Sequence, residues 1–448
     1  MALTYKRLIV VGGGFAGTKT TKALEHTLPA DWILLLISQE NFITFNPLLP
    51  EVVGASILPG HVIAPHRQMI HCSLTWMATV SEIDTANRVV HYLGEGPGTV
   101  RYDQLVLACG TEANLDIVKG MAQNALPLKT LGDALFLRNH IIARLEQAEL
   151  QPDALHRRWL MTFIVVGGGF SGVETAGELV DFLSASLRYY KRIRAADLRI
   201  VLLHSGERLL PELSASLGAF TLRKMRARGV QVRLGERAAR VTDRAVHLDS
   251  GEILEGGTVV CTIGTQPNRL LEQLPAAKVR GRLVVNPDMS VPGLEGVWAA
   301  GDCAAVPNAL DGMVCPPTAQ FAESQAKQLA VNIVARLNGA PTRPFRYRSG
   351  GQLSSIGHNK AVAEIGGVKL SGFVAWLMWR GLFLLRIPTL ARKSRLFLEW
   401  NWAMFFPPDI SHFGYRRTRR RAPSAAAPTV APAAEVSRSP RQDDPRAL

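Results

Sequence analysis

The sequence predicts an α/β protein with two Rossmann-like dinucleotide-binding domains, followed by amphipathic C-terminal helices suited to anchoring at a membrane. Residues 7–17, RLIVVGGGFAG, read as a buried strand that runs into a glycine-rich turn and the start of a helix. Residues 163–172, FIVVGGGFSG, repeat this pattern. A basic stretch rich in tryptophan, phenylalanine and leucine follows both copies, between residues 373 and 406.

Both glycine-rich turns match the G-x-G-x-x-G fingerprint, whose glycines allow a tight turn, close approach of a diphosphate and close packing of the helix. The fingerprint glycines are Gly12, Gly14 and Gly17 in the first copy, and Gly167, Gly169 and Gly172 in the second. One fingerprint is weak evidence, because glycine-rich turns also occur for packing reasons. Two imply two dinucleotides, which is the architecture of an enzyme that passes electrons between a flavin and a nicotinamide.

The composition indicates a largely globular chain of two or three domains: 448 residues, of which 47% are hydrophobic and 20% charged. The formal net charge is +14, and residues 416–421, RRTRRR, hold five arginines. Further basic residues lie between 380 and 395. Basic residues beside an apolar segment favour an anionic membrane surface as partner. Nucleic acid is the rival partner, but no nucleic-acid fold motif is present.

The five cysteines, which are Cys72, Cys109, Cys261, Cys303 and Cys315, include no C-x-x-C or similarly close pair. This spacing argues against a disulfide reductase and for a reducing, cytoplasmic setting. The chain passes from Met1 directly into the first strand, so no secretory signal is expected.

The first half of the chain supplies the expected flavin contacts. A second strand is expected over residues 32–37, and an acid at the end of this strand usually binds the adenosine ribose. Here Ser38 and Gln39 come first, and Glu40 is the candidate acid. Residues 41–51, NFITFNPLLPE, are expected to form an irregular loop that packs against a flat aromatic ring. The alternative is a simple surface loop. Residues 102–110 form another strand that ends at a glycine.

The second fingerprint is expected after a helical stretch over residues 126–148. Glu174 and Glu178 share one face of the helix that the fingerprint opens, and we expect one of them to be solvated and Glu174 to lie near the nicotinamide. The next strand ends in His204, where NAD-binding copies often place an acid. Since Arg208 nearby suits a 2′-phosphate, the choice between NADH and NADPH stays open. Residues 259–264 close this domain.

The return to the first domain is expected at residues 297–304, VWAAGDCA. Asp302 suits a hydrogen bond from a ribityl hydroxyl, or alternatively caps the next helix. A long amphipathic helix is expected over residues 318–339, with Gln320 at its opening, where free N–H groups would face a reduced flavin.

The last folded section differs in kind. Residues 373–385 and 396–406 are rich in Trp, Phe and Leu but are interrupted by charges, so neither reaches the ~20 apolar residues that span a bilayer. Such a composition is typical of an interfacial helix pair, with a dimer interface or buried core helices as the alternatives. The Pro, Ala and Ser-rich stretch after Arg421 is expected to be a disordered tail.

These motifs together resemble those of the type II NADH:quinone oxidoreductases, over roughly residues 5–415. NFITFNPLLPEVVGA resembles the family's flavin-side loop, GGGFSGVETAGEL its nicotinamide fingerprint, and CPPTAQFAESQA the stretch between flavin and quinone. LPLKTLGDALFLRNHI resembles its inter-domain helix, and GGQLSSIGHNKAVAEIGGVKLSGFVAWLMW the approach to its membrane-anchoring C-terminus.

The resemblance implies a peripheral enzyme on the cytoplasmic face of the inner membrane, with non-covalent FAD, NADH as substrate and a membrane quinone as acceptor. The implied FAD contacts are Gly12, Gly14, Phe15, Ala16, Gly17, Glu40, Pro47, Ala108, Gly110, Asp302, Ala319 and Gln320. The implied NAD(P)H contacts are Gly167, Gly169, Phe170, Gly172, Glu174, His204 and Gly264. The quinone is expected at Gln320, Ser324 and Lys360, and no metal site is expected. Ser324 departs from the family pattern, which has a second glutamine there, and His204 departs from the usual acid.

The expected division of the chain follows from the same resemblance. Residues 1–118 and 283–345 are expected to bind FAD, residues 119–282 NAD(P)H, residues 346–415 the membrane, and residues 416–448 to form the basic tail. Three alternatives stay open: a soluble FAD-dependent NAD(P)H oxidase or ferredoxin reductase, a membrane redox sensor without turnover, and association as a homodimer. A sulfide:quinone oxidoreductase would need paired redox cysteines, which the spacing does not suggest.

Overall fold

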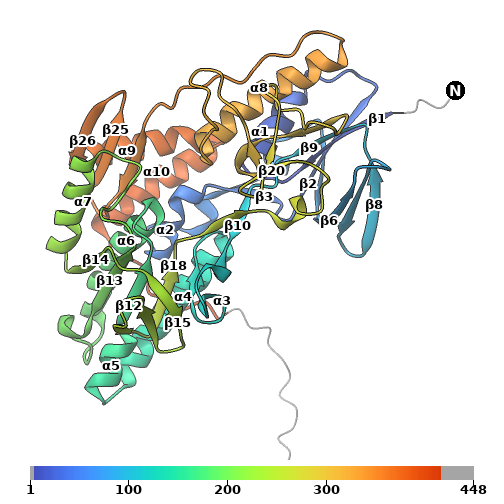
Figure 1. Cartoon of the computed structure of the whole chain (residues 1–448). Coiled ribbons are helices and arrows are strands. Elements are labelled where there is room, and N and C mark those ends of the chain that lie inside the picture. The colour runs from blue at the N-terminus through green and yellow to red at the C-terminus, as the bar shows by residue number, and fades with distance from the viewer. Residues whose placement is uncertain (1–4, 415–448) are drawn as a thin grey trace, which may run out of the picture. The chain divides into compact units, whose positions relative to one another are not determined.

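Two five-stranded parallel sheets support the two glycine-rich turns (Figure 1). The structure, a computed structural model, describes residues 5–414, and those up to His412 form one compact unit. The first sheet has the spatial order β22 (Val297–Ala299), β9 (Gln104–Leu107), β1 (Lys6–Val11), β2 (Trp32–Ser38) and β5 (Leu74–Met77). The second has the order β11 (Leu126–Pro127), β18 (Thr258–Cys261), β12 (Thr162–Val166), β13 (Arg199–His204) and β14 (Val230–Leu234).

The central strands are buried on both faces, which is why they read as continuous apolar runs. Leu8, Ile9 and Val10 of β1 are fully buried, and so are Phe163, Ile164 and Val165 of β12. Each of these strands is followed by a glycine turn and a helix that returns to the sheet. The expected α/β fold with two similar halves, each built around a glycine-rich turn, is therefore confirmed.

The longer helices cover these sheets and the space between them. Their bounds are α1 (Phe15–Leu24), α2 (Leu49–Val53), α3 (Met121–Asn124), α4 (Leu131–Leu150), α5 (Ala154–Leu160), α6 (Phe170–Ser186), α7 (Ala215–Ala227) and α8 (Ala319–Leu337). Helices α1 and α8 lie side by side over the first sheet (Figure 1). Short 3-10 turns cover Asn46–Leu48, Pro59–His61, His66–Gln68, Leu115–Ile117, Leu187–Tyr189, Ala195–Asp197, Arg269–Leu271 and Gly301–Cys303.

Smaller antiparallel sheets extend both halves. They comprise β6 (Thr79–Asp84), β7 (Val89–Leu93) and β8 (Pro97–Arg101); β15 (Ala238–Val241), β16 (Ala245–Leu248) and β17 (Ile253–Glu255); and β24 (Gln352–Ser355), β25 (Ala361–Ile365) and β26 (Val368–Gly372). Two ribbons pair β3 (Phe42–Thr44) with β4 (Ile63–Pro65) and β10 (Thr111–Ala113) with β19 (Thr265–Pro267). A last sheet contains β20 (Lys278–Val279), β21 (Arg282–Val284) and β23 (Ala304–Ala305).

Two expectations about local structure were wrong. The segment 41–51 is not irregular throughout, because β3 and a 3-10 turn lead into α2, with Pro50 in the first helical turn, where its missing N–H costs nothing. The helix expected from residue 126 begins only at Leu131, since Leu126 and Pro127 pair with β18 as β11. A capping box between Thr130 and Asp133 sets that start.

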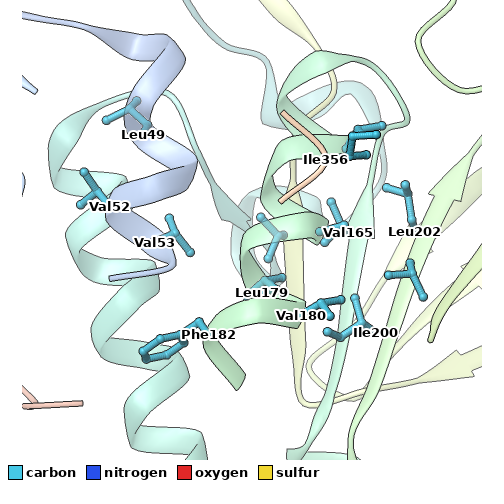
Figure 2. Close-up of a cluster of buried hydrophobic side chains, with 14 of the residues drawn as sticks. Leu49, Val52, Val53, Val165, Leu179, Val180, Phe182, Ile200, Leu202 and Ile356 are labelled. Carbon is cyan, nitrogen blue, oxygen red and sulfur yellow. The ribbon is translucent and has the colours of Figure 1, made fainter. Parts of the chain in front are cut away.

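The core between the two halves centres on α2, α4 and α6. Figure 2 shows Leu49, Val52 and Val53 of α2 in one cluster with side chains of α6, β12 and β13. At Gly177, α6 touches the backbone that follows β24, because a Cβ there would lie 2.8 Å from the carbonyl carbon of Ile356 and 2.9 Å from the N of Gly357. The β24–β26 sheet therefore packs on α6 without a side chain between them at this point.

The C-terminal section forms two helices, α9 (Phe373–Arg386) and α10 (Leu390–Phe405), as expected. One face of this pair is buried and includes Trp376, Trp379 and Trp400. The opposite face exposes Phe373, Val374, Leu377, Leu385, Leu390, Phe397, Leu398, Trp402 and Phe405. Within residues 5–414, no helix is both long and apolar enough to cross a bilayer. The predicted tail and its arginine cluster lie outside the described residues.

Candidate functional site

A cavity of about 970 Å³ is lined by the first glycine turn, by the start of α6 and by α9. Its lining includes most of the residues expected to contact FAD, namely Gly12, Gly14, Phe15, Ala16, Glu40, Pro47, Ala108, Gly110, Asp302, Ala319 and Gln320. Of the residues expected to contact NAD(P)H, the lining includes Phe170, Glu174 and Gly264. The fold thus brings most of the first predicted set and part of the second to one cavity.

The first turn is built around three glycines with different roles. Gly12 has φ +106° and presses on the next strand, since a Cβ on it would lie 2.3 Å from Ala108 O. A Cβ on Gly17 would lie 1.8 Å from Gly12 O, so α1 packs directly on the turn, and Gly17 itself is outside the cavity lining. Gly14 has no neighbour within 4 Å of such a Cβ and faces open space. The open side of the turn is thus free for a ligand.

His66 supports this turn from behind, and no motif in the sequence pointed to this role. The buried imidazole donates from Nε2 to Gly13 O at 2.9 Å, and burial lowers its pKa. A neutral ring with its proton on Nε2 therefore holds the turn in shape. A lone histidine far from any motif cannot be assigned this role from the sequence alone.

Lys129 and Asp302 place opposite charges on the wall of the same cavity. Lys129 Nζ donates to Thr111 Oγ1 at 2.8 Å. Burial lowers the pKa of Lys129 and raises that of Asp302, while the attraction between the two opposes both shifts. Asp302 was expected here, whereas no role was expected for Lys129. Together they offer an acceptor and a donor to a polyhydroxyl chain.

The second turn repeats the geometry of the first. Gly167 has φ +125°, and a Cβ on Gly172 would lie 1.8 Å from Gly167 O. The N–H of Gly168 donates to His204 Nδ1 at 3.2 Å, and burial lowers the pKa of that histidine. Gly167, Gly169, Gly172 and His204 all lie outside the cavity lining, so a nucleotide on this turn would reach the cavity only with its far end.

Glu174 and Glu178 on α6 are both buried, with 7% and 6% of their surface exposed. The expectation that one of them is solvated was wrong, because α2 and the β24–β26 sheet cover this helix. Ser355 N donates to Glu174 Oε1 at 3.1 Å, and Ser56 Oγ donates to Glu178 Oε2 at 2.8 Å. Burial raises the pKa of Glu174 to about 8 and that of Glu178 well above its usual range. Glu174 is therefore largely protonated at neutral pH.

Glu51 joins this buried group from α2, another contact that the sequence did not reveal. Trp400 Nε1 donates to Glu51 Oε2 at 2.7 Å, and burial raises the pKa of Glu51 to about 7. The Arg380 guanidinium of α9 attracts Glu51 and Glu178 and lies 3.9 Å from the centre of the Trp376 ring. The C-terminal helices are thus joined to α2 by a hydrogen bond and by charge.

Gln320 lines the cavity from the start of α8. Its Nε2 donates to Gly351 O at 2.8 Å, and Tyr347 OH donates to its Oε1 at 3.4 Å. Leu382, Phe383 and Arg386 of α9 complete this end of the lining. Ser324, one helical turn beyond Gln320, and Lys360, in the turn between β24 and β25, lie outside the lining.

The residues present suit a dinucleotide whose diphosphate lies on the first turn. The volume is at the upper end for a small-molecule site, and the first turn of α1 leaves its N–H groups without a side-chain cap. Glu40 is exposed at the rim, where an adenosine ribose would lie. Pro47 and Gln320 both contribute to the lining of the same cavity.

Comparisons with known proteins identify the family and the fold. Residues 6–326 match the family model described as pyridine nucleotide-disulphide oxidoreductase. The chain is 32% identical over 413 residues to the type II NADH:quinone oxidoreductase Ndh of Mycobacterium tuberculosis, covering 88% of this chain and 87% of the relative. It is 27% identical to the internal alternative NAD(P)H-ubiquinone oxidoreductase A1 of Arabidopsis thaliana, over 90% of this chain and 85% of that protein. The structure of NDH2 from Plasmodium falciparum in complex with NADH has a TM-score of 0.83 at 18% identity, covering 91% and 99% of the two chains.

Proposed function

This chain belongs to the type II NADH:quinone oxidoreductases, with the fold of the pyridine nucleotide-disulphide oxidoreductases, and from that membership we propose how its residues divide the reaction. The chain oxidises NADH and reduces a quinone through a bound flavin. One observation carries the assignment of sites: a single cavity is lined by the first glycine turn, by the start of α6 and by α9. The three participants can therefore meet in one place.

The flavin is assigned as non-covalent FAD, because the open side of Gly14 and the start of α1 suit a diphosphate. Residues 1–118 and 283–345 are assigned to FAD, and residues 119–282 to NADH. Held in this cavity, the flavin would supply the hydride acceptor for NADH and the two-electron donor for the quinone. Glu40 would hold the adenosine ribose and Asp302 the ribityl chain, while His66 keeps the diphosphate turn in shape.

The nicotinamide is assigned to the end of the cavity at Phe170, Glu174 and Gly264. Glu174 is held by Ser355 and carries a proton at neutral pH, so it positions the ring without adding a negative charge beside the flavin. His204 lacks the charge with which an acid would repel a 2′-phosphate. We therefore expect NADPH to be accepted beside NADH.

The quinone is assigned to the end of the cavity formed by Gln320 and α9. Gly351 and Tyr347 fix the amide of Gln320, which leaves it in one orientation to bind a quinone carbonyl. Ser324 and Lys360 lie outside the lining, so we assign them supporting roles at most, at the approach to the membrane.

The exposed apolar face of α9 and α10 is assigned to lipid rather than to a second copy of the chain. Apolar side chains on this face lie beside Arg386, Arg392, Lys393 and Arg395, which is the pattern of an interfacial helix on an anionic surface. The arrangement has a physical reason, because quinone is dissolved in lipid while NADH is in water. All five cysteines are free thiols, which supports the cytoplasmic side.

Stopped-flow spectroscopy of the full chain on anionic vesicles tests the reaction. NADH should bleach the flavin absorbance, and a short-chain quinone should restore it. A flavin that NADH does not bleach would overturn the enzyme assignment and favour a sensor. Reoxidation by oxygen or a ferredoxin but not by quinone would favour the soluble oxidase or reductase instead.

Vesicle flotation tests the membrane assignment separately. The double variant Trp402→Ser and Phe405→Ser removes two side chains that are 63% and 80% exposed, and it should lose most binding to vesicles that contain phosphatidylglycerol. Leu155→Ser, which removes an 80% exposed leucine from α5, is the matched control and should still float. Equal binding of both variants to the vesicles would refute the assignment of this face to lipid. If the double variant instead loses a dimer in sedimentation, the face would bind a second copy of the chain.

A further inference from the structure

Arg386 is the last residue of α9, and it lines the cavity one helical turn beyond Leu382. Among the cations of α9 and α10, it alone contributes to this lining. Its neighbour Leu385 is 73% exposed on the face that we assign to lipid, whereas Arg386 itself is half-buried. A cation therefore lies at the border between that face and the cavity.

The charge of Arg386 has no partner in the described part of the chain, where its guanidinium makes neither a hydrogen bond nor an ion pair. Other cations of the lining are matched. Arg269 Nε lies 3.2 Å from Glu112 Oε1, and Lys129 attracts Asp302. A partly buried charge without a partner is unfavourable, so a guanidinium with five N–H donors is suited to an oxygen acceptor on a ligand.

Helix α8 places Gln320 and Glu323 on one face, three residues apart. Gln320 shares the main cavity with Arg386, and Glu323 lines a second cavity with it. Because this second cavity has a volume of only about 10 Å³, the residues that line it lie close together. Glu323 forms an ion pair with Lys19, at an N–O distance of 3.9 Å. Arg386 therefore lies against the same face of α8 as Gln320, with its charge still unmatched.

Aromatic rings lie beside Arg386. Phe15 and Phe45 line the small cavity with it, and Phe383 lines the main one. The ring centre of Phe45 is 5.6 Å from that of Phe15 and 5.7 Å from that of Phe383, and both pairs meet edge to face. Such apolar surroundings lower the local dielectric constant, which strengthens the attraction between a cation and a negatively charged ligand oxygen.

We propose that Arg386 is a catalytic residue of quinone reduction, which binds the quinone oxygen that becomes negatively charged. As a hydride passes from the reduced flavin to the quinone, an N–H bond breaks and an O–H bond forms on one quinone oxygen, so the flavin is oxidised and the other oxygen becomes an anion. Water then supplies the second proton of the hydroquinone. Arg386 keeps its own proton and donates hydrogen bonds to the anionic oxygen. The proposal rests on the assignment of the quinone to Gln320 and α9.

Binding of a hydroxyquinone anion tests the site without turnover. Lawsone, a hydroxynaphthoquinone, is an anion at neutral pH, and its methyl ether is a neutral counterpart of similar shape. Calorimetric titration of the oxidised full chain with bound FAD should show that the wild type prefers lawsone by roughly tenfold or more. Arg386→Met should lose this preference, and Arg386→Lys, which keeps the charge, should retain part of it. Arg395→Met, which removes an exposed cation of α10 outside the lining, is the matched control.

Stopped-flow reoxidation of the prereduced flavin by a short-chain quinone tests the catalytic role. Arg386→Met should slow this step by roughly tenfold or more, while Arg395→Met reoxidises like the wild type. In steady-state turnover, kcat should fall more than KM rises, because the negative charge arises only during reduction. Bleaching by NADH, FAD affinity and vesicle flotation of Arg386→Met should be unchanged.

An Arg386→Met enzyme with the wild-type preference for lawsone and the wild-type rate of reoxidation would overturn the proposal. Weaker FAD binding would instead assign Arg386 to the diphosphate, and loss of flotation with an unchanged rate would assign it to lipid headgroups; either result would also overturn it. A wild type that binds lawsone through Arg386 but is not reoxidised by quinone would contradict the proposed function and not the binding site.

Discussion

Replacing Glu174 by Gln should change how stability depends on pH. Burial raises the pKa of Glu174 in the folded protein to about 8, from 4.5 for the ordinary side chain. Between these values the folded state keeps a proton that the unfolded state has lost, so stability is full below pH 4.5, falls as pH rises and levels off above pH 8. Each pH unit in this window costs about 1.4 kcal/mol. Gln carries no such proton and keeps an oxygen to accept from Ser355 N.

The expected magnitude follows from these values. From pH 5 to pH 7 the variant should gain roughly 3 kcal/mol relative to the wild type. For a unit of this size, one kcal/mol corresponds to about 1 °C in Tm, so the gap between the two Tm values should widen by about 3 °C. The assay is thermal unfolding of the full chain with excess FAD in detergent, at pH 5, 6 and 7.

The informative quantity is how the difference in Tm between variant and wild type changes with pH. The amide itself also changes the stability, but by the same amount at every pH. Glu95→Gln, in the exposed turn between β7 and β8, is the matched control and should show no widening. If the difference in Tm between Glu174→Gln and the wild type stays constant from pH 5 to pH 7, this carboxyl does not hold its proton on folding. The proposal that a protonated Glu174 positions the nicotinamide would then fail as well.

Three further outcomes are expected. Gln320→Leu should slow flavin reoxidation by quinone by roughly tenfold, the value of one hydrogen bond, while bleaching by NADH is unchanged; equal losses in both half-reactions would refute its role. His204→Glu keeps an acceptor for Gly168 N and adds a charge that repels a 2′-phosphate, so the ratio of kcat/KM for NADH over NADPH should rise roughly tenfold or more. Gly14→Val meets no chain atom near its Cβ and should fold, but FAD titration should show at least about tenfold weaker binding; unchanged affinity would place the diphosphate elsewhere.

The sequence predicted those parts of the site that depend on local backbone geometry. Gly12, Gly17, Gly167 and Gly172 could be placed because a tight turn against a helix tolerates no other residue at these positions. The C-terminal helices could be predicted for a similar reason, since their apolar and basic residues recur with helical spacing.

The parts that were missed depend on contacts between distant segments. His66 acquires its role only when the chain folds back under Gly13, and Lys129 only when it meets Asp302. The pattern around Glu178 is compatible with a surface residue, because nothing near it in sequence says that α2 and the β24–β26 sheet will cover it. Local patterns predict the faces of a helix but not what packs against both of them.

The contact at Gly177 has a mechanical consequence. With no side chain between α6 and the backbone after β24, any residue larger than glycine at position 177 would push the helix and the β24–β26 sheet apart. The same sheet packs against α9, and α9 lines the cavity. Enlarging this one residue is therefore expected to displace a wall of the cavity that the residue itself does not line.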